Sequence, residues 1–79
     1  GNNESTNRPI VTRKLISLIT KNGFVNKKGT KHGKYERDGD SHVIMVPRHK
    51  NVTSGLSKRM CKELIELHGF SKKDILKLF

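Results

Sequence analysis

A tight turn at Asp38-Gly39 sets the centre of the fold of this 79-residue chain. Asp-Gly favours the two-residue loop of a β-hairpin, so residues 31–37 and 41–46 are expected to pair as antiparallel strands. Pro47 ends the second of them, because proline has no N–H for the ladder. Residues 24–28 are predicted to form a further short strand before the hairpin.

Helical periodicity flanks these strands on both sides. A first helix is predicted over residues 12–22, and a second from Thr53 or Ser54 to His68, followed by a short terminal helix. The apolar stripe of the second helix is expected at Leu56, Met60, Leu64 and Leu67, with Cys61 and Ile65 beside it. The predicted boundary residues are Thr12 and Ser71 as N-caps and Gly23 and Gly69 at the helix ends.

The order of these elements, α-β-β-β-α, defines an α+β fold with a three-stranded antiparallel sheet. Both amphipathic helices are expected on one face of the sheet, which leaves the other face open. Side chains alternate along a strand, so Tyr35 would point toward the helices. His32, Lys34 and Glu36 would then point toward solvent.

Positive charge is spread along the whole chain. Lys and Arg number 17 against 7 Asp and Glu, a formal net charge of +10. Such a field favours polyanions, which are nucleic acids or acidic proteins. The single cysteine, Cys61, excludes an internal disulfide framework and is expected to be a small buried hydrophobe in a reducing, cytoplasmic compartment. The chain has no apolar run of the ~18 residues that a transmembrane helix needs, so neither a transmembrane helix nor a signal peptide is expected.

The segment Gly29-Thr30-Lys31-His32 places one imidazole among lysines, with Lys27, Lys28 and Lys34 close by. Imidazole, with an unperturbed pKa of ~6.5, accepts and donates protons near neutral pH. Lysines attract phosphate, so the combination favours a small nucleic-acid enzyme. The alternative is an exposed strand histidine without a task, beside a charge run that keeps sheet edges apart.

Three motifs follow one another in the chain: Thr12-Arg13-Lys14-Leu15-Ile16 through Asn22-Gly23-Phe24, then Gly29-Thr30-Lys31-His32, then Val46-Pro47-Arg48-His49. Together they resemble the HicA family of toxin–antitoxin ribonucleases. The resemblance implies a double-stranded-RNA-binding-like fold. A flexible N-terminal tail is expected over residues 1–9, and a single HicA-like domain over residues 10–79.

The family signature is a glycine, a Ser or Thr, a variable residue and a histidine, which matches Gly29 to His32. The resemblance implies that His32 is the catalytic residue of an mRNA endoribonuclease without a cofactor. It also implies a HicB-type antitoxin protein that covers the active site, with oligomers formed only with that partner. Many members have a second histidine where this chain has Lys31, so a mechanism with two adjacent imidazoles is not expected.

Lys34 is the first candidate for an RNA phosphate contact, because it shares a strand face with His32. Lys28, Lys31 and Arg48 are further candidates, since ammonium and guanidinium groups both bind phosphate oxygens. Gly29 would let the backbone turn or approach a phosphate closely.

The other histidines have simpler interpretations. His49 is either a second proton carrier or, more simply, a loop hydrogen-bonding residue. His42 and His68 are interpreted as structural, and His68 would suit the negative end of a helix dipole.

The acidic residues form no convergent set, and the histidines lack the spacing of zinc ligands, so cleavage is predicted to be metal-independent. Attack by a ribose 2′-hydroxyl would select RNA over DNA. Two other classes remain open: a non-catalytic RNA-binding module, and a basic partner of an acidic protein.

Overall fold

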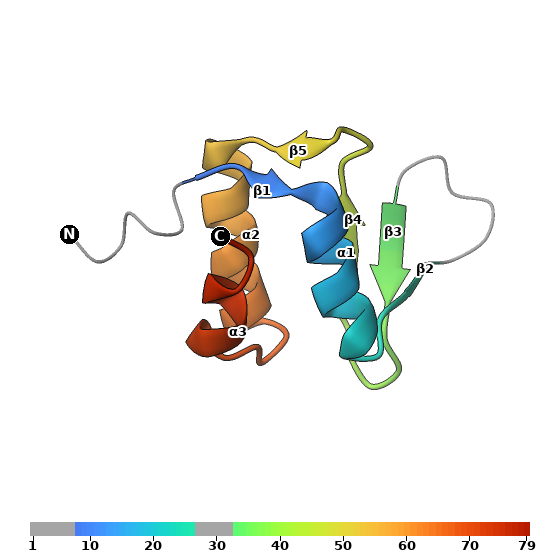
Figure 1. The fold of residues 1–79 in the computed structure, drawn as a ribbon. Helices are drawn as coiled ribbons and strands as arrows, with labels where there is room; N and C mark the ends of the chain where they lie inside the picture. The colour runs from blue at the N-terminus through green and yellow to red at the C-terminus, as the bar shows by residue number, and fades with distance from the viewer. Residues whose placement is uncertain (1–7, 27–32) are drawn as a thin grey trace.

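The computed structural model describes residues 8–26 and 33–79 (Figure 1). Its elements are β1 (Ile10–Val11), α1 (Thr12–Lys21), β2 (Val25–Asn26), β3 (Gly33–Glu36), β4 (Ile44–Val46), β5 (Asn51–Val52), α2 (Ser54–Glu66) and α3 (Lys72–Leu76). The described residues confirm an α+β fold in which the three strands of the central sheet, β2 to β4, follow α1 and precede α2 in the chain. The short strands β1 and β5 were not predicted.

The central sheet has the order β2-β3-β4, and both neighbouring pairs are antiparallel. The Asp38-Gly39 hairpin is confirmed: Gly39 has a φ of 84°, and the Asp40 N–H donates to the Arg37 carbonyl at 3.1 Å. The strand predicted over residues 41–46 is shorter, however, and begins at Ile44. One cause is that the His42 N–H donates to the Asp40 carboxylate at 3.1 Å.

A second, two-stranded sheet joins β1 to β5, with Ile10 opposite Val52 and Val11 opposite Asn51. The segment between Pro47 and Thr53, for which no strand was predicted, therefore contains β5. Ile10 and Val52 are both fully buried. A pair of two-residue strands this far apart in the chain has no periodicity that a sequence window can detect.

Thr12 is not the N-cap of α1, which corrects the sequence-based prediction. The cap is Val11, and Thr12 is the first helical residue. The Thr12 hydroxyl donates across to the His49 carbonyl at 2.6 Å instead of accepting an N–H of its own helix. At the other end the prediction holds, because Gly23 has a φ of 94° and the Phe24 N–H donates to the Ile19 carbonyl at 3.1 Å.

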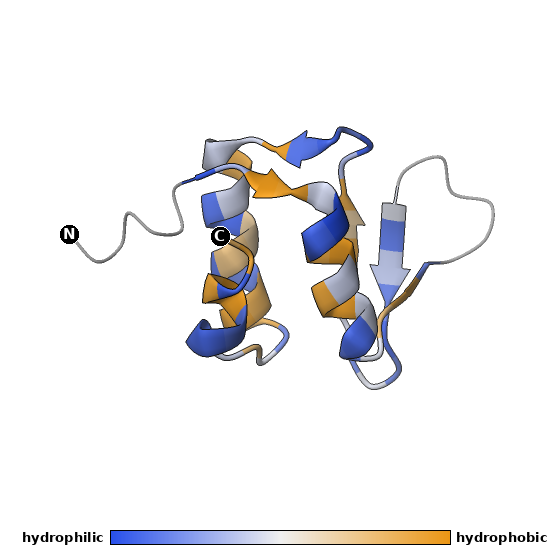
Figure 2. Cartoon of the chain, in the orientation of Figure 1, coloured by the Kyte–Doolittle hydropathy of each residue, from blue (hydrophilic) through white to orange (hydrophobic). Residues whose placement is uncertain are grey.

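One core lies between the helices and one face of the sheet. Figure 2 shows the apolar sides of α1 and α2 turned toward each other. Burying each large apolar side chain stabilises the fold by about 1.5–3 kcal/mol. The buried set is Ile10, Leu15, Ile19, Phe24, Tyr35, Ile44, Val46, Val52, Met60, Cys61, Leu64, Phe70, Ile75 and Leu78.

The predicted alternation along β3 is confirmed. Tyr35 is buried under the helices, while Lys34 and Glu36 on either side of it are partly exposed. Lys34 lies opposite Met45, and Glu36 lies opposite Val25. The exposed side chains of Met45 and Val25 therefore share the open face with these charged residues.

Helix α2 ends at Glu66, two residues earlier than predicted. Leu67 is 45% exposed and does not belong to the apolar stripe, whereas Ser57 is fully buried. The chain turns at Gly69, whose φ is 76°, and the Phe70 N–H donates to the Leu64 carbonyl at 2.9 Å. The prediction for Ser71 is confirmed, because its hydroxyl caps α3 by accepting from the Asp74 N–H at 3.2 Å.

The prediction for Cys61 is also confirmed: it is a buried free thiol on α2. Burial raises the pKa of the Cys61 thiol, so the neutral form is favoured. Among the described helices, none is both long and apolar enough to cross a membrane.

Candidate nucleic-acid interface

Four of the six predicted site residues lie outside the described residues. They are Lys28, Gly29, Lys31 and His32, all within residues 27–32. Their roles stay predictions. The described part of the chain places the other two, Lys34 and Arg48, and shows where the segment that carries His32 joins the sheet.

Lys34 lies on the open face of β3, as predicted, with 41% of its side chain exposed. Its Nζ is 4.0 Å from the Glu36 Oε2, at the outer limit of an ion pair. An exposed pair of this kind contributes about 0–1 kcal/mol, so it leaves the ammonium free to bind a phosphate instead.

The strand register brings the first residue of β3 to the end of β4. Gly33 pairs with Val46, and Arg48 follows Val46 by two residues. The approach is close: a Cβ built on Gly33 would lie 3.1 Å from the Val46 carbonyl oxygen and 3.2 Å from Tyr35 Cε1. The signature segment Gly29 to His32 therefore joins the described sheet at the same end as Arg48.

The loop that follows β4 is fixed to the start of α1. The Thr12 hydroxyl donates to the His49 carbonyl at 2.6 Å, and the Thr12 N–H donates to the Lys50 carbonyl at 2.9 Å. These two bonds hold the main chain of the loop, while the side chains of Arg48, His49 and Lys50 are exposed.

Positive charge gathers where this loop meets the helix. Arg13 and Lys14 are exposed in the first turn of α1, which contains no acidic residue. With Arg48 and Lys50 they form what we call the basic end. Its position at the N-terminus of α1 adds the positive end of the helix dipole. In Figure 1 this loop, the start of α1 and the start of β3 all lie at one end of the molecule.

A polar cluster that the sequence did not predict is centred on Asp40. The Nδ1 of His68 lies 2.6 Å from Asp40 Oδ2, and the Arg37 Nη2 donates to the same oxygen at 3.1 Å. Both the Asp40 and the His68 side chains are buried. The hydrogen bond from His68, and after it the one from the His42 N–H, lowers the pKa of Asp40 to about 2.

Arg37 extends this cluster to three parts of the chain. It donates to the Asn22 carbonyl after α1 at 3.0 Å and to the His68 carbonyl after α2 at 2.9 Å. Its guanidinium carbon lies 4.5 Å from the centre of the Phe24 ring. The interpretation of His68 as structural fits these contacts, but its partner is a carboxylate. No sequence signal joins His68 to Asp40, because the two residues are 28 positions apart.

Over residues 8–26 and 33–79, no three His, Cys, Asp or Glu side chains converge closely enough to hold a metal ion. Comparison of the chain with protein-family models, with curated proteins and with solved structures finds no match.

Proposed function

We propose that this chain is the toxin of a type II toxin–antitoxin system and acts in the cytoplasm as an endoribonuclease that cleaves mRNA. His32 is its catalytic residue. The observation that carries the proposal is the position of the basic end: Arg48 lies where the Gly29–His32 signature joins the sheet at Gly33. The element order agrees with the double-stranded-RNA-binding-like fold that the resemblance to HicA implies.

In this mechanism the His32 imidazole takes the proton of a ribose 2′-hydroxyl. The 2′-oxygen attacks the adjacent phosphorus, a new O–P bond forms, and the bond from phosphorus to the 5′-oxygen breaks. The departing 5′-oxygen takes up a proton, which leaves a 2′,3′-cyclic phosphate and a 5′-hydroxyl. No metal ion is required.

Cations hold the RNA and stabilise the negative charge that develops on the phosphate. Lys34 supplies one from the open face of β3, and Arg48 supplies another from the basic end. Lys31 adds charge within the signature segment and Lys28 adds charge just before it, and Gly29 lets the backbone come close to a phosphate. The HicB-type antitoxin would cover this face and block the RNA from it.

The test replaces His32 with alanine and measures RNA cleavage and RNA binding on the same preparation. We expect cleavage to fall about 10²–10⁴-fold, the usual contribution of a positioned general acid–base, while the dissociation constant for RNA stays within about threefold. His42→Ala is the matched control, because His42 is exposed near the hairpin at the other end of β4 and should retain cleavage. Equal activity of the wild type and His32→Ala would contradict the proposal.

A non-catalytic RNA-binding module is the alternative. The basic end would serve such a module equally well, since binding of the RNA backbone needs only cations at phosphate spacing. A wild-type protein that binds RNA in a salt-dependent manner and never cuts it would establish this alternative.

A further inference from the structure

The strand β4 is an edge strand of the described sheet, and among the described residues its outer edge has no strand beside it. The four residues from Val43 to Val46 are all apolar and include no proline, lysine or other charge. Proteins usually protect an edge strand with prolines or charged residues, because unpaired main-chain groups otherwise recruit another strand. Met45 is 49% exposed and Val43 is 43% exposed, so this edge is also open at its side chains.

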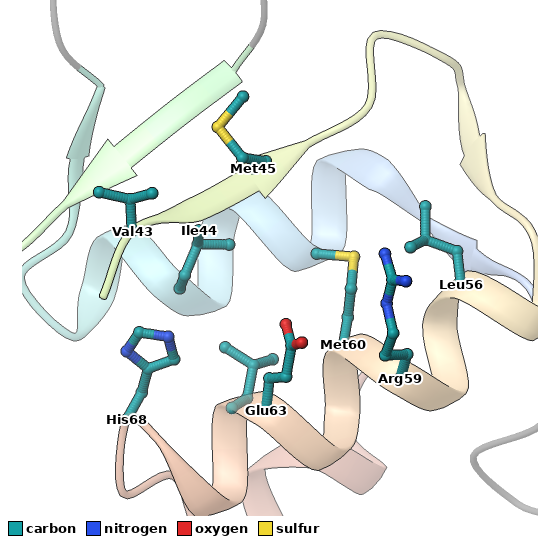
Figure 3. A pocket seen from close by; sticks show the side chains of 9 residues that line it. Val43, Ile44, Met45, Leu56, Arg59, Met60, Glu63 and His68 are labelled. Atoms are coloured by element: carbon teal, nitrogen blue, oxygen red, sulfur yellow. The ribbon is translucent and has the colours of Figure 1, made fainter. Parts of the chain in front are cut away.

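A groove runs between this edge and α2 (Figure 3). Its volume is about 180 Å³. Val43, Ile44 and Met45 border it on the strand side, where Ile44 points toward α2 and Met45 points to the open face of the sheet (Figure 3). Leu56, Met60 and Leu64 border it on the helix side. The apolar lining lies beside the unpaired edge of β4, so an extended segment could contact both at once. An added strand would bond to the edge of β4 and place alternate side chains in the groove.

Polar groups reach this groove from α2 and from the turn that follows it. Arg59 and Glu63 border it along the helix, and the His68 ring borders it at one end (Figure 3). The Asp40 carboxylate occupies His68 Nδ1 at 2.6 Å, which fixes the proton on that nitrogen.

We propose that the groove between β4 and α2 binds an extended, acidic segment of a partner protein, which adds to the sheet as a strand beside β4. This proposal does not depend on RNA cleavage. Charge decides between the possible occupants. The chain carries a net charge of +10, so two copies repel each other while an acidic segment is attracted. On α2, the exposed cations outnumber the exposed carboxylates: the cations are Lys58, Arg59 and Lys62, and the carboxylates are Glu63 and Glu66.

The test is a titration of the full chain with peptides, monitored through the NMR signals of its backbone amides. The probes are a peptide of alternating glutamate and valine, the same peptide with lysine for glutamate, and the glutamate peptide N-methylated on alternate residues. We expect the glutamate peptide to shift the signals of Ile44–Val46 and of the α2 residues in the groove. We expect it to bind at least tenfold more tightly than either of the other peptides, since one of these reverses the charge attraction and the other removes main-chain donors.

Met45→Asp and Val25→Asp form a matched pair of variants. Both replace an exposed apolar residue on an edge strand of the sheet and change the charge equally, and only Met45 lines the groove. Met45→Asp should weaken binding of the glutamate peptide at least fivefold, and Val25→Asp should leave it unchanged. Thermal unfolding within a few degrees of the wild type would show that both variants fold.

The proposal is overturned if the glutamate peptide causes no shift at millimolar concentration, or if the lysine peptide binds as tightly. It is also overturned if the Met45-dependent event is self-association of the chain. Displacement of the glutamate peptide from these signals by an RNA oligonucleotide would assign the groove to nucleic acid and overturn it as well.

Discussion

Gly33 faces Val46 so closely that a side-chain carbon on Gly33 would meet the Val46 carbonyl oxygen at 3.1 Å. This pair joins the start of β3, which follows the signature segment in the chain, to the end of β4, which precedes Arg48. The φ of Gly33 is not positive, so the reason for a glycine here is space rather than backbone conformation.

Gly33→Ala is therefore expected to destabilise the protein by about 1–3 kcal/mol, the usual cost of forcing an extra methyl group into a packed site. Gly55→Ala is the control, because Gly55 lies in α2 with open space around it and alanine favours a helix. Urea unfolding measures both. A Gly33→Ala protein as stable as the wild type would show that the close approach is not a constraint.

The Asp40 cluster predicts a specific acid sensitivity. In the folded state the pKa of Asp40 is lowered from 3.8 to about 2. A carboxyl group whose pKa is lower in the folded state stabilises the fold at pH values above its unfolded-state pKa. This stabilisation is lost as the pH falls through its folded-state pKa. We expect the free energy of unfolding of the wild type to fall between about pH 4 and pH 2 more steeply than that of Asp40→Asn.

Asp74→Asn is the control for this acid sensitivity, because Asp74 is a partly exposed residue whose ion pair with Lys77 has an N–O distance of 3.7 Å. Urea midpoints at several pH values give the comparison. If Asp74→Asn reduces the loss of stability at low pH as much as Asp40→Asn does, the buried contact between Asp40 and His68 has no special role.

Arg37→Lys is expected to be destabilising by about 1–3 kcal/mol although it keeps the charge. A lysine has no planar fork, and it cannot replace the three bonds of Arg37 to the carbonyls of Asn22 and His68 and to Asp40. Arg59→Lys on the exposed side of α2 should change stability by less than about 0.5 kcal/mol. Equal midpoints for the two variants in chemical unfolding would refute this role of Arg37.

The basic end predicts a change in the salt dependence of RNA binding. Replacing both Arg48 and Lys50 with alanine should weaken binding. On single-stranded RNA, the plot of the log of the binding constant against the log of the salt concentration should also become less steep. Its slope should decrease in magnitude by about 0.7 for each phosphate that the protein no longer neutralises. The double variant Lys72→Ala/Lys73→Ala on α3 removes the same charge from another part of the surface. A slope that changes equally in both double variants would mean that net charge alone governs binding.

Much of this fold was predictable because its signals are local. The Asp38-Gly39 turn, the inward position of Tyr35, the burial of Cys61 and the cap at Ser71 each depend on a few neighbouring residues. The prediction of Thr12 as an N-cap was wrong because it used only local sequence. A threonine before an apolar stripe has the pattern of an N-cap, but its hydroxyl bonds to His49, 37 positions away.

The parts that sequence did not reveal are long-range. The β1–β5 pair and the contact between Asp40 and His68 both join segments that lie far apart in the chain. The candidate site shows the same division. The outward position of Lys34 follows from strand alternation, whereas the fixation of the Arg48 loop to α1 depends on bonds that only the folded chain makes.

The most direct measurement of the central claim is the chemistry of the ends produced when the purified protein cuts RNA in the presence of a chelator. The account predicts that cutting continues without metal ions, that every new 5′ end carries a hydroxyl, and that replacing the 2′-hydroxyl at the cut position with hydrogen abolishes cleavage there. Cleavage that stops with the chelator, or new ends that carry a 5′-phosphate, would contradict a mechanism in which His32 activates the ribose.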